Sequence, residues 1–300
     1  MHILTNPGSN LAENLIEHYK LHITPQQIAV DGEYHDTRKG FPFETIDAWV
    51  QKAKKHPFVI GTSASQFANW FTDLGADGKA ILAIQTSRKL IHSYNSAMTS
   101  LETFEKHGQA ELARRIRVVD SLSTDVGAGL LTLLAAEARA SGLGLEEIGK
   151  LLDAAAPTMR SILTLATLDN LVKGGKASFV KAWIADALNI RPVLELRDGE
   201  LKAVGKVSTR ADAPDKVVEY LSSMIPPGTD VWAAIAHGNN AGAARRLEER
   251  LRKTYSVRFL YLRPLSPSIY LHCGPGAVFG ILLPLASLPW QPKKPPPDPV

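Results

Sequence analysis

Cysteine is nearly absent from the sequence, which has one, Cys273, among 300 residues. A disulfide within the chain is therefore excluded, and the composition fits a reducing compartment. Apolar runs approaching the roughly 20 residues of a membrane-spanning helix are lacking as well. The N-terminal stretch MHILTNPGSN does not have the basic and apolar regions of a secretion signal. We expect a cytoplasmic protein without a transmembrane segment, and leave only a transient contact with a membrane open.

An excess of charge of one sign is also missing. The chain has 34 basic and 30 acidic residues and a formal net charge of +4. These charges are scattered, whereas nucleic-acid binding requires a basic patch or stripe, so nucleic acid is excluded as a partner. The nine histidines do not follow the spacing of metal ligands. We therefore expect neither a metal ion nor a cofactor.

The pattern of apolar residues indicates two lobes of different architecture. In the first half, the apolar runs HILT, FVIGT, AILAIQT and IRVVDS are each followed by a segment of helical period. This alternation is typical of an α/β lobe with a mainly parallel sheet, which we place at residues 1–158. The second half has shorter runs and a hairpin signature, RDGE, which favours an α+β lobe with a mixed or antiparallel sheet over residues 159–288. The Pro-rich residues 289–300 are predicted to be a flexible tail.

Hydroxyl side chains follow the predicted strands of the first lobe. In an open parallel sheet, ligands lie beyond the carboxyl ends of the strands, where helix N-termini favour anions. The hydroxyls therefore predict an anion site, although each can equally be a helix N-cap. They are Thr5, Thr62, Ser63, Thr86, Ser87, Ser121, Ser123 and Thr124.

The segment LHCGPGAVFG, residues 271–280, contains a second candidate for ligand binding. We interpret SIYLHC as a strand and the following residues as a turn. Gly274 and Gly276 leave room for a ligand or a second backbone to approach closely, which makes His272 a candidate donor. For Cys273 we favour the role of a small buried filler.

Several motifs in a fixed order resemble the DegV family of bacterial fatty-acid-binding proteins. They span residues 2–285 and read GTSAS, IQTSRKLIHSYNSA, VVDSLSTDVGAG, LATLDNLVKGGK, LNIRPVLELRDGEL and LHCGPGAVFG. The resemblance implies two lobes with a long-chain fatty acid in a tunnel between them. It also implies a lipid carrier without enzymatic activity of its own, which presents the carboxylate to an ATP-dependent fatty-acid kinase for acyl-phosphate formation.

The resemblance assigns roles to residues of this chain. Thr62 and Ser63 match the family's Thr-Ser pair and His272 its histidine, which hold the ligand carboxylate. Ser93, which stands where the family has a threonine, would supply the remaining donor. Supporting residues would be His92, Ser96, Ser121, Lys176, Gly274 and Gly276. The tunnel would be lined by residues that include Phe67, Leu165, Leu168 and Phe279.

The chain departs from the family pattern at several places, among them Ala64-Ser65-Gln66-Phe67, where the family has Gln-Pro-Ser-Pro. Ile91 stands where the family has a carboxylate-binding serine, and Asn6-Pro7 replaces an Asp-Ser pair. Lys176 replaces an arginine. A planar guanidinium, which can bind two oxygen atoms at once, is thereby replaced by a compact ammonium group. A carrier of a different amphiphilic anion therefore stays open as an alternative.

A serine hydrolase acting on acyl substrates is the other alternative. GTSAS resembles the nucleophile elbow G-x-S-x-G, except that Ser65 replaces the second glycine. Such an enzyme would use Ser63 as nucleophile and His272 as base, with Asp120 as the third member of a triad.

Overall fold

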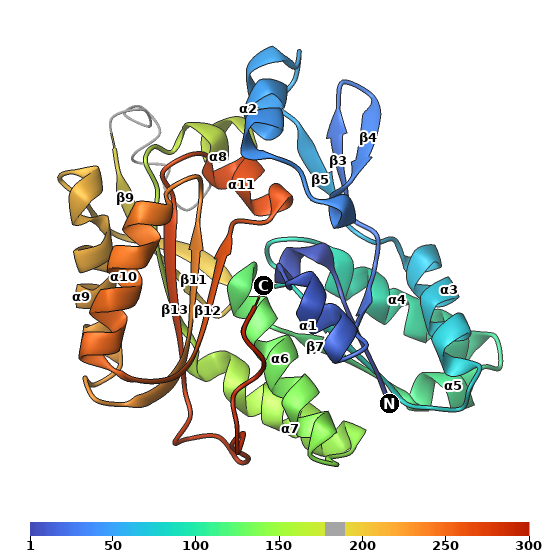
Figure 1. Ribbon diagram of the computed structural model, residues 1–300. Helices are drawn as coiled ribbons and strands as arrows, with labels where there is room; N and C mark the ends of the chain where they lie inside the picture. The colour runs from blue at the N-terminus through green and yellow to red at the C-terminus, as the bar shows by residue number, and fades with distance from the viewer. Residues whose placement is uncertain (178–189, 300) are drawn as a thin grey trace.

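The computed structural model describes residues 1–177 and 190–299. Its first sheet is parallel, with the strand order β2-β1-β6-β7 (Figure 1). The strands are β1 (His2–Thr5), β2 (His22–Ile23), β6 (Ile81–Gln85) and β7 (Ile116–Asp120). The helices of this lobe are α1 (Glu13–His18), α3 (Ala64–Gly75), α4 (Ser93–Lys106), α5 (Ala110–Arg114), α6 (Val126–Ala140) and α7 (Leu145–Ala155). The predicted parallel α/β lobe is confirmed.

The second sheet is mixed, as expected, with the order β10-β9-β8-β13-β11-β12. Its strands are β8 (Arg160–Thr164), β9 (Pro192–Arg197), β10 (Glu200–Lys206), β11 (Asp230–His237), β12 (Ser256–Pro264) and β13 (Val278–Pro284). Neighbouring strands are antiparallel except for β11 and β12, which are parallel. The helices α9 (Ala213–Met224) and α10 (Ala241–Thr254) cover one face of this sheet (Figure 1).

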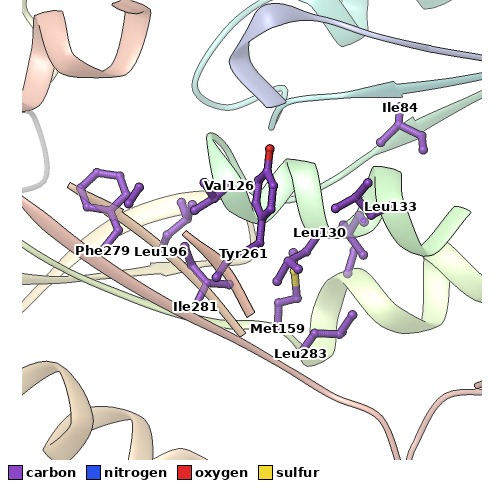
Figure 2. Packing of buried hydrophobic residues seen from close by; sticks show 14 of the residues in the cluster. Ile84, Val126, Leu130, Leu133, Met159, Leu196, Tyr261, Phe279, Ile281 and Leu283 are labelled. Carbon is purple, nitrogen blue, oxygen red and sulfur yellow. The ribbon is translucent and has the colours of Figure 1, made fainter. Parts of the chain in front are cut away.

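Helix α6 packs between the two sheets. Every residue from Val126 to Ala138 is buried, because this segment is apolar except for Thr132 and Glu137 and contacts strands of both lobes. Figure 2 shows Leu130 and Val126 of this helix among side chains of the second sheet such as Ile281. The hydroxyl of Tyr261 donates to the carbonyl of Asn10 at 2.8 Å and so joins the lobes. A shared core therefore fixes the lobes against each other.

A third, three-stranded sheet was not anticipated. It has the order β4-β3-β5 and consists of β3 (Gln27–Val30), β4 (Glu33–Asp36) and β5 (Phe58–Ile60). Helix α2 (Phe43–Lys52) lies between β4 and β5 in the chain. The interpretation of FVIGT as a strand of the parallel sheet was wrong, since β5 pairs antiparallel with β3. The partner of β5 is the first strand of a β3–β4 hairpin, which has a tight turn at Asp31 and Gly32 with φ angles of +48° and +96°.

The interpretation of SIYLHC as a strand was also wrong. Pro267–Cys273 form helix α11, near α8 (Asp169–Lys173) and α2 (Figure 1). Pro267 occupies the first turn, where its missing N–H is not needed and its fixed φ favours a helix. The helix ends at Gly274, whose φ of +68° gives the predicted turn.

The C-terminal residues after β13 return to the N-terminal lobe. Trp290 packs against the main core, and Pro296 is buried. The side chain of Asn14 in α1 donates to the carbonyl of Asp298 at 2.9 Å. In Figure 1 the chain accordingly ends close to α1 and α6. The segment that the sequence predicts to be a flexible tail thus has defined contacts in this structure.

The predicted RDGE hairpin is confirmed, and its tip touches the first lobe. Strands β9 and β10 are antiparallel, and the carbonyl of Gly199 accepts a hydrogen bond of 2.9 Å from Ser87 Oγ. Gly199 has a φ of +79°. A methyl group at this position would collide with Ser87 Oγ.

We expect Gly199→Ala to lower the free energy of unfolding by more than the roughly 1–2 kcal/mol of left-handed backbone strain, because it also separates the hairpin from Ser87. Urea unfolding checks this. The control is Gly142→Ala, which has a φ of +92° and no atom within 4 Å of the new methyl group, so it reports backbone strain alone. Equal losses in the two variants would show that the hairpin contact contributes nothing.

Candidate functional site

A cavity of about 790 Å³ lies between the two lobes. This volume is in the range of ligand sites in proteins. Its apolar lining residues are Phe58, Val59, Leu90, Ile91, Leu163, Leu171, Leu201, Ile269 and Phe279. Its polar lining side chains are Gln26, Thr86, Lys89, Thr124, Lys176, Glu200, Ser268, His272 and Cys273. The site is thus largely apolar, with polar groups at selected positions.

The fold explains which segments reach this cavity. Thr86 follows β6, and Thr124 lies in the loop after β7, at the carboxyl ends of parallel strands where ligand sites are expected. The opposite wall comes from α8, α11 and the β9–β10 hairpin. Lys89 and Glu200 connect the lobes at the cavity by an ion pair of 3.0 Å. Both side chains are exposed, so this pair contributes at most about 1 kcal/mol.

His272 lies in the cavity wall, in the last turn of α11. Its Nδ1 is buried and has no hydrogen-bond partner within the described part of the chain. Burial, with the nearby charges of Lys176 and His56, lowers the pKa of His272 to about 4. At neutral pH the ring is therefore neutral, with one N–H donor and one acceptor.

Cys273 lines the same cavity, although alternation along a strand would have turned it away from His272. The helical conformation of α11 explains the difference. Burial raises the pKa of the Cys273 thiol, so the group stays protonated and is a poor nucleophile.

Thr62 and Ser63 are not among the described residues that line the cavity. Thr62 is buried, and its Oγ1 lies 2.7 Å from the carbonyl oxygen of Pro25 and 2.8 Å from Thr24 Oγ1. Ser63 is exposed and caps α3, since its Oγ accepts from Gln66 N and the Gln66 side chain accepts from Ser63 N. The helix-cap interpretation of Ser63 is confirmed, and its role toward a ligand stays a proposal.

Ser93 begins α4, and its buried Oγ has no partner among residues 1–177 and 190–299. It lies against Gly61, where a methyl group would be 2.6 Å from Ser93 Oγ and 3.2 Å from the Ile91 side chain. Ile91 in turn lines the cavity. His92 is exposed, and Ser96 is half-buried in the same helix.

The remaining supporting residues differ in their surroundings. Ser121 Oγ donates to the carbonyl of Ser123 within its own turn at 3.1 Å. Lys176 lines the cavity and donates to the carbonyl of Leu90 at 3.3 Å, across the two lobes. Gly274 and Gly276 both have positive φ angles, +68° and +85°, so their backbone conformation favours glycine.

Of the four predicted tunnel residues, Phe279 lines the cavity. Leu165 and Leu168 are buried in the core cluster that also contains Phe279. Phe67 packs instead with Phe71 and other side chains between α3, α4 and the parallel sheet. The reason is that Phe67 and Phe71, four residues apart, lie on the face of α3 that covers its own sheet.

The triad of the hydrolase alternative is not assembled in the described residues. Ser63 Oγ lies 3.1 Å from Ser65 Oγ and accepts from Gln66 N, and no hydrogen bond joins it to His272. Asp120 accepts from the backbone N–H of Leu122 at 2.9 Å. A nucleophile that is not in contact with its base is not activated.

Sequence reasoning missed several residues at the cavity. Lys89, Glu200 and Ser268 line it, and His56 lies beside Gly174 in its wall. The place of Ser268 in the first turn of a helix could have been predicted from Ser266-Pro267, which is a typical helix start. The other three carry no local signal, because their partners are distant in the sequence.

Neither a metal site nor a membrane span is found in the described ranges. Within residues 1–177 and 190–299, three or more His, Cys, Asp or Glu side chains do not gather in a way that could hold a metal ion. The helices described in these ranges are too short or too polar to cross a membrane.

The chain is similar in sequence to curated bacterial proteins over nearly its whole length. It is 26% identical over 275 residues to a DegV domain-containing protein of Caldanaerobacter subterraneus subsp. tengcongensis, and the alignment covers 92% of this chain and 95% of that protein. It is 28% identical over 284 residues to a DegV domain-containing protein of Streptococcus pyogenes, covering 93% and 97%.

Solved structures share the fold. A DegV family protein from Thermus thermophilus, described as fatty-acid binding, aligns with a TM-score of 0.85 at 22% identity over 95% of this chain and 99% of that one. A DegV family protein from Eubacterium eligens loaded with heptadecanoic acid aligns with a TM-score of 0.80 at 20% identity, covering 95% and 99%.

A family model described as an uncharacterised protein of the DegV family matches residues 1–283. The match includes all three sheets, apart from Pro284 at the end of β13, and every described residue that lines the cavity. The chain therefore belongs to the DegV family.

Proposed function

We propose that this protein binds a long-chain fatty acid in the cavity between its lobes. The observation that carries the proposal is the cavity of about 790 Å³, with Phe279 and Leu163 in its apolar lining and His272 in its wall. Structural relatives that bind fatty acids, including the one with heptadecanoic acid, support the choice of ligand.

The apolar walls would hold the acyl chain. Burial contributes roughly 0.8 kcal/mol for each CH₂ group, so a chain of about 16 carbons brings ample gross driving force before entropy is subtracted. Leu171 and Leu201 extend the apolar surface on the side of the second lobe, and Ile91 extends it on the side of the first.

His272, which lines the cavity, would be one donor to the carboxylate. Ser93, whose buried Oγ has no partner in the described residues, would be another. A carboxylate removed from water needs such donors to offset the loss of hydration. Thr62 and Ser63 would join them by rotating away from Pro25 and Gln66. The ammonium group of Lys176 would add a positive charge at the cavity.

The protein would act as a cytoplasmic carrier that presents the bound acid to an ATP-dependent kinase partner, and not as an enzyme. Transfer of a phosphoryl group needs an accessible, positioned carboxylate. The polar groups Lys89, Lys176 and Glu200 at the cavity are exposed, so a head group beside them would be within reach of a partner.

Native mass spectrometry of gently purified protein tests the proposal. We expect a bound acid of about 250–300 Da, the range of common 16- and 18-carbon acids whose tails would supply the burial energy, and uptake of labelled palmitate by stripped protein. A bound amphiphile of different mass would favour the alternative that Ile91 and Lys176 have changed the ligand. Protein that is empty and takes up no palmitate would contradict the proposal.

A further inference from the structure

Two histidines from different segments border the same glycine position in the cavity wall. Gly174 lines the cavity, and a methyl group built on it would lie 3.1 Å from His272 Nδ1 and 3.3 Å from His56 Cδ2. Both imidazole rings therefore border the space beside Gly174, and their charges interact. His272 also lines the cavity itself.

Three ring nitrogens of this pair are buried without a hydrogen-bond partner in the described ranges. They are Nδ1 and Nε2 of His56 and Nδ1 of His272. Buried side-chain polar atoms are nearly always hydrogen-bonded in folded proteins, and the exceptions often mark functional sites. The function proposed for the cavity does not use His56, so the pair needs its own explanation.

Burial, with the charges around the pair, favours the neutral form of both rings while no anion is bound. His272 faces Lys176 and His56, and burial is the main cause that lowers its pKa. His56 faces Lys173, which lowers its pKa further after burial, and Asp169, which opposes this effect. Lys173 and Asp169 also pair with each other at 2.8 Å, whereas Lys176 is the lysine whose charge lowers the pKa of His272.

An anionic head group beside His272 would reverse this balance. An opposite charge within a few ångströms favours the protonated imidazole. An imidazolium has two N–H donors. If one of them donates to the head group and the other faces the cavity wall, the second N–H needs an acceptor in the wall. Nδ1 of His272 lies on the side of Gly174, and the His56 atom nearest to that position is Cδ2. Rotation of the neutral His56 ring about its Cβ–Cγ bond would put Nδ1 in the place of Cδ2 and offer the lone pair that this second donor needs.

We propose that His56 and His272 act as a pair that takes up one proton from solvent when an anionic head group binds in the cavity. This inference rests on the proposed function of the cavity. The proton forms one new N–H bond on His272, and His56 stays neutral because a second positive charge so close would be repelled. His56 is a positioning residue, since it acts on the ligand through His272.

Calorimetric titration with dodecanoate tests the proposal. Titrations at pH 6 in two buffers of different protonation enthalpy give the number of protons taken up for each ligand bound. We expect a value near one, and an affinity that falls by up to tenfold for each unit of pH between 6 and 8, because the complex binds a proton that the free protein does not. Uptake near zero with normal binding would overturn the inference and leave the proposed function standing, whereas absence of any binding would overturn both.

Three variants separate a role of His56 in proton uptake from a role in folding. His56→Phe keeps a ring but removes the acceptor, so we expect proton uptake near zero and a flat dependence of affinity on pH. His56→Gln keeps an acceptor and should restore part of both. His18→Phe is the matched control, because His18 is exposed on α1, and should behave as the unchanged protein. Full proton uptake in a folded His56→Phe variant would overturn the role of His56.

Discussion

Replacing Asp125 by alanine is expected to lower the free energy of unfolding by about 3 kcal/mol or more. The carboxylate is fully buried and accepts four hydrogen bonds. Asn10 Nδ2 and Val126 N donate to Oδ1 at 2.8 and 3.0 Å, and the backbone N–H and Oγ of Ser266 donate to Oδ2 at 3.0 and 2.7 Å. Alanine would leave several buried donors without an acceptor, each costing roughly 1–3 kcal/mol.

The position of Asp125 makes this loss relevant to the cavity. Asn10 belongs to the first lobe and Ser266 precedes α11 of the second, so the carboxylate joins the lobes close to the helix that carries His272. We therefore expect Asp125→Ala also to weaken ligand binding, by loosening the wall that α11 forms. Urea unfolding and dodecanoate titration measure the two effects.

The backbone of Asp125 provides an internal comparison. Its φ of +51° and ψ of −138° are unfavourable for residues other than glycine, at a cost of about 1–3 kcal/mol. Asp125→Gly loses the same hydrogen bonds but relieves this strain, so it should be more stable than Asp125→Ala. Asp73→Ala, at an exposed position on α3, should change stability by less than about 0.5 kcal/mol. A loss in Asp125→Ala no larger than in Asp73→Ala would refute the argument.

The main features of the fold were predictable because they depend on local periodicity. Strand-then-helix segments such as Ile81–Gln85 followed by Ser93–Lys106 carry their pattern in adjacent residues. The small sheet was missed although Asp31-Gly32 is the same dipeptide as Asp198-Gly199, which correctly predicted a hairpin. Helix α11 was misread because a short apolar run fits a strand or a helix equally well, and Ser266-Pro267, not the run, identifies it.

The candidate site was predictable only where a motif marks it. The Gly-rich surroundings of His272 identified a residue that does lie in the cavity wall. His56, which borders the same space beside Gly174, is 216 residues away in the sequence and precedes a short apolar strand without any motif that marks a site. The ion pair of Lys89 and Glu200 similarly joins two segments that only the packing of the lobes brings together. Contacts between lobes depend on how α6 and the hairpin tip dock, and local sequence does not encode that.

His272→Ala is expected to weaken binding of dodecanoate by about 1–3 kcal/mol, or roughly 5- to 150-fold. The reason is that the carboxylate, partly removed from water, would lose a donor that solvent replaces only in part, while the acyl chain keeps its apolar contacts. Cys273→Ala is the matched control, because it removes the neighbouring side chain of the same helix from the same cavity.

The two variants distinguish hydrogen bonding by His272 from the packing of side chains in the cavity wall. The Cys273 thiol is protonated and only a weak donor, so its loss should change the affinity by less than about threefold, within the range of a minor packing effect. If His272→Ala and Cys273→Ala weaken binding equally, the wall of α11 contributes only shape. If His272→Ala leaves the affinity unchanged, the head group lies at another end of the cavity, and Ser93 and the exposed Ser63 become the donors to test next.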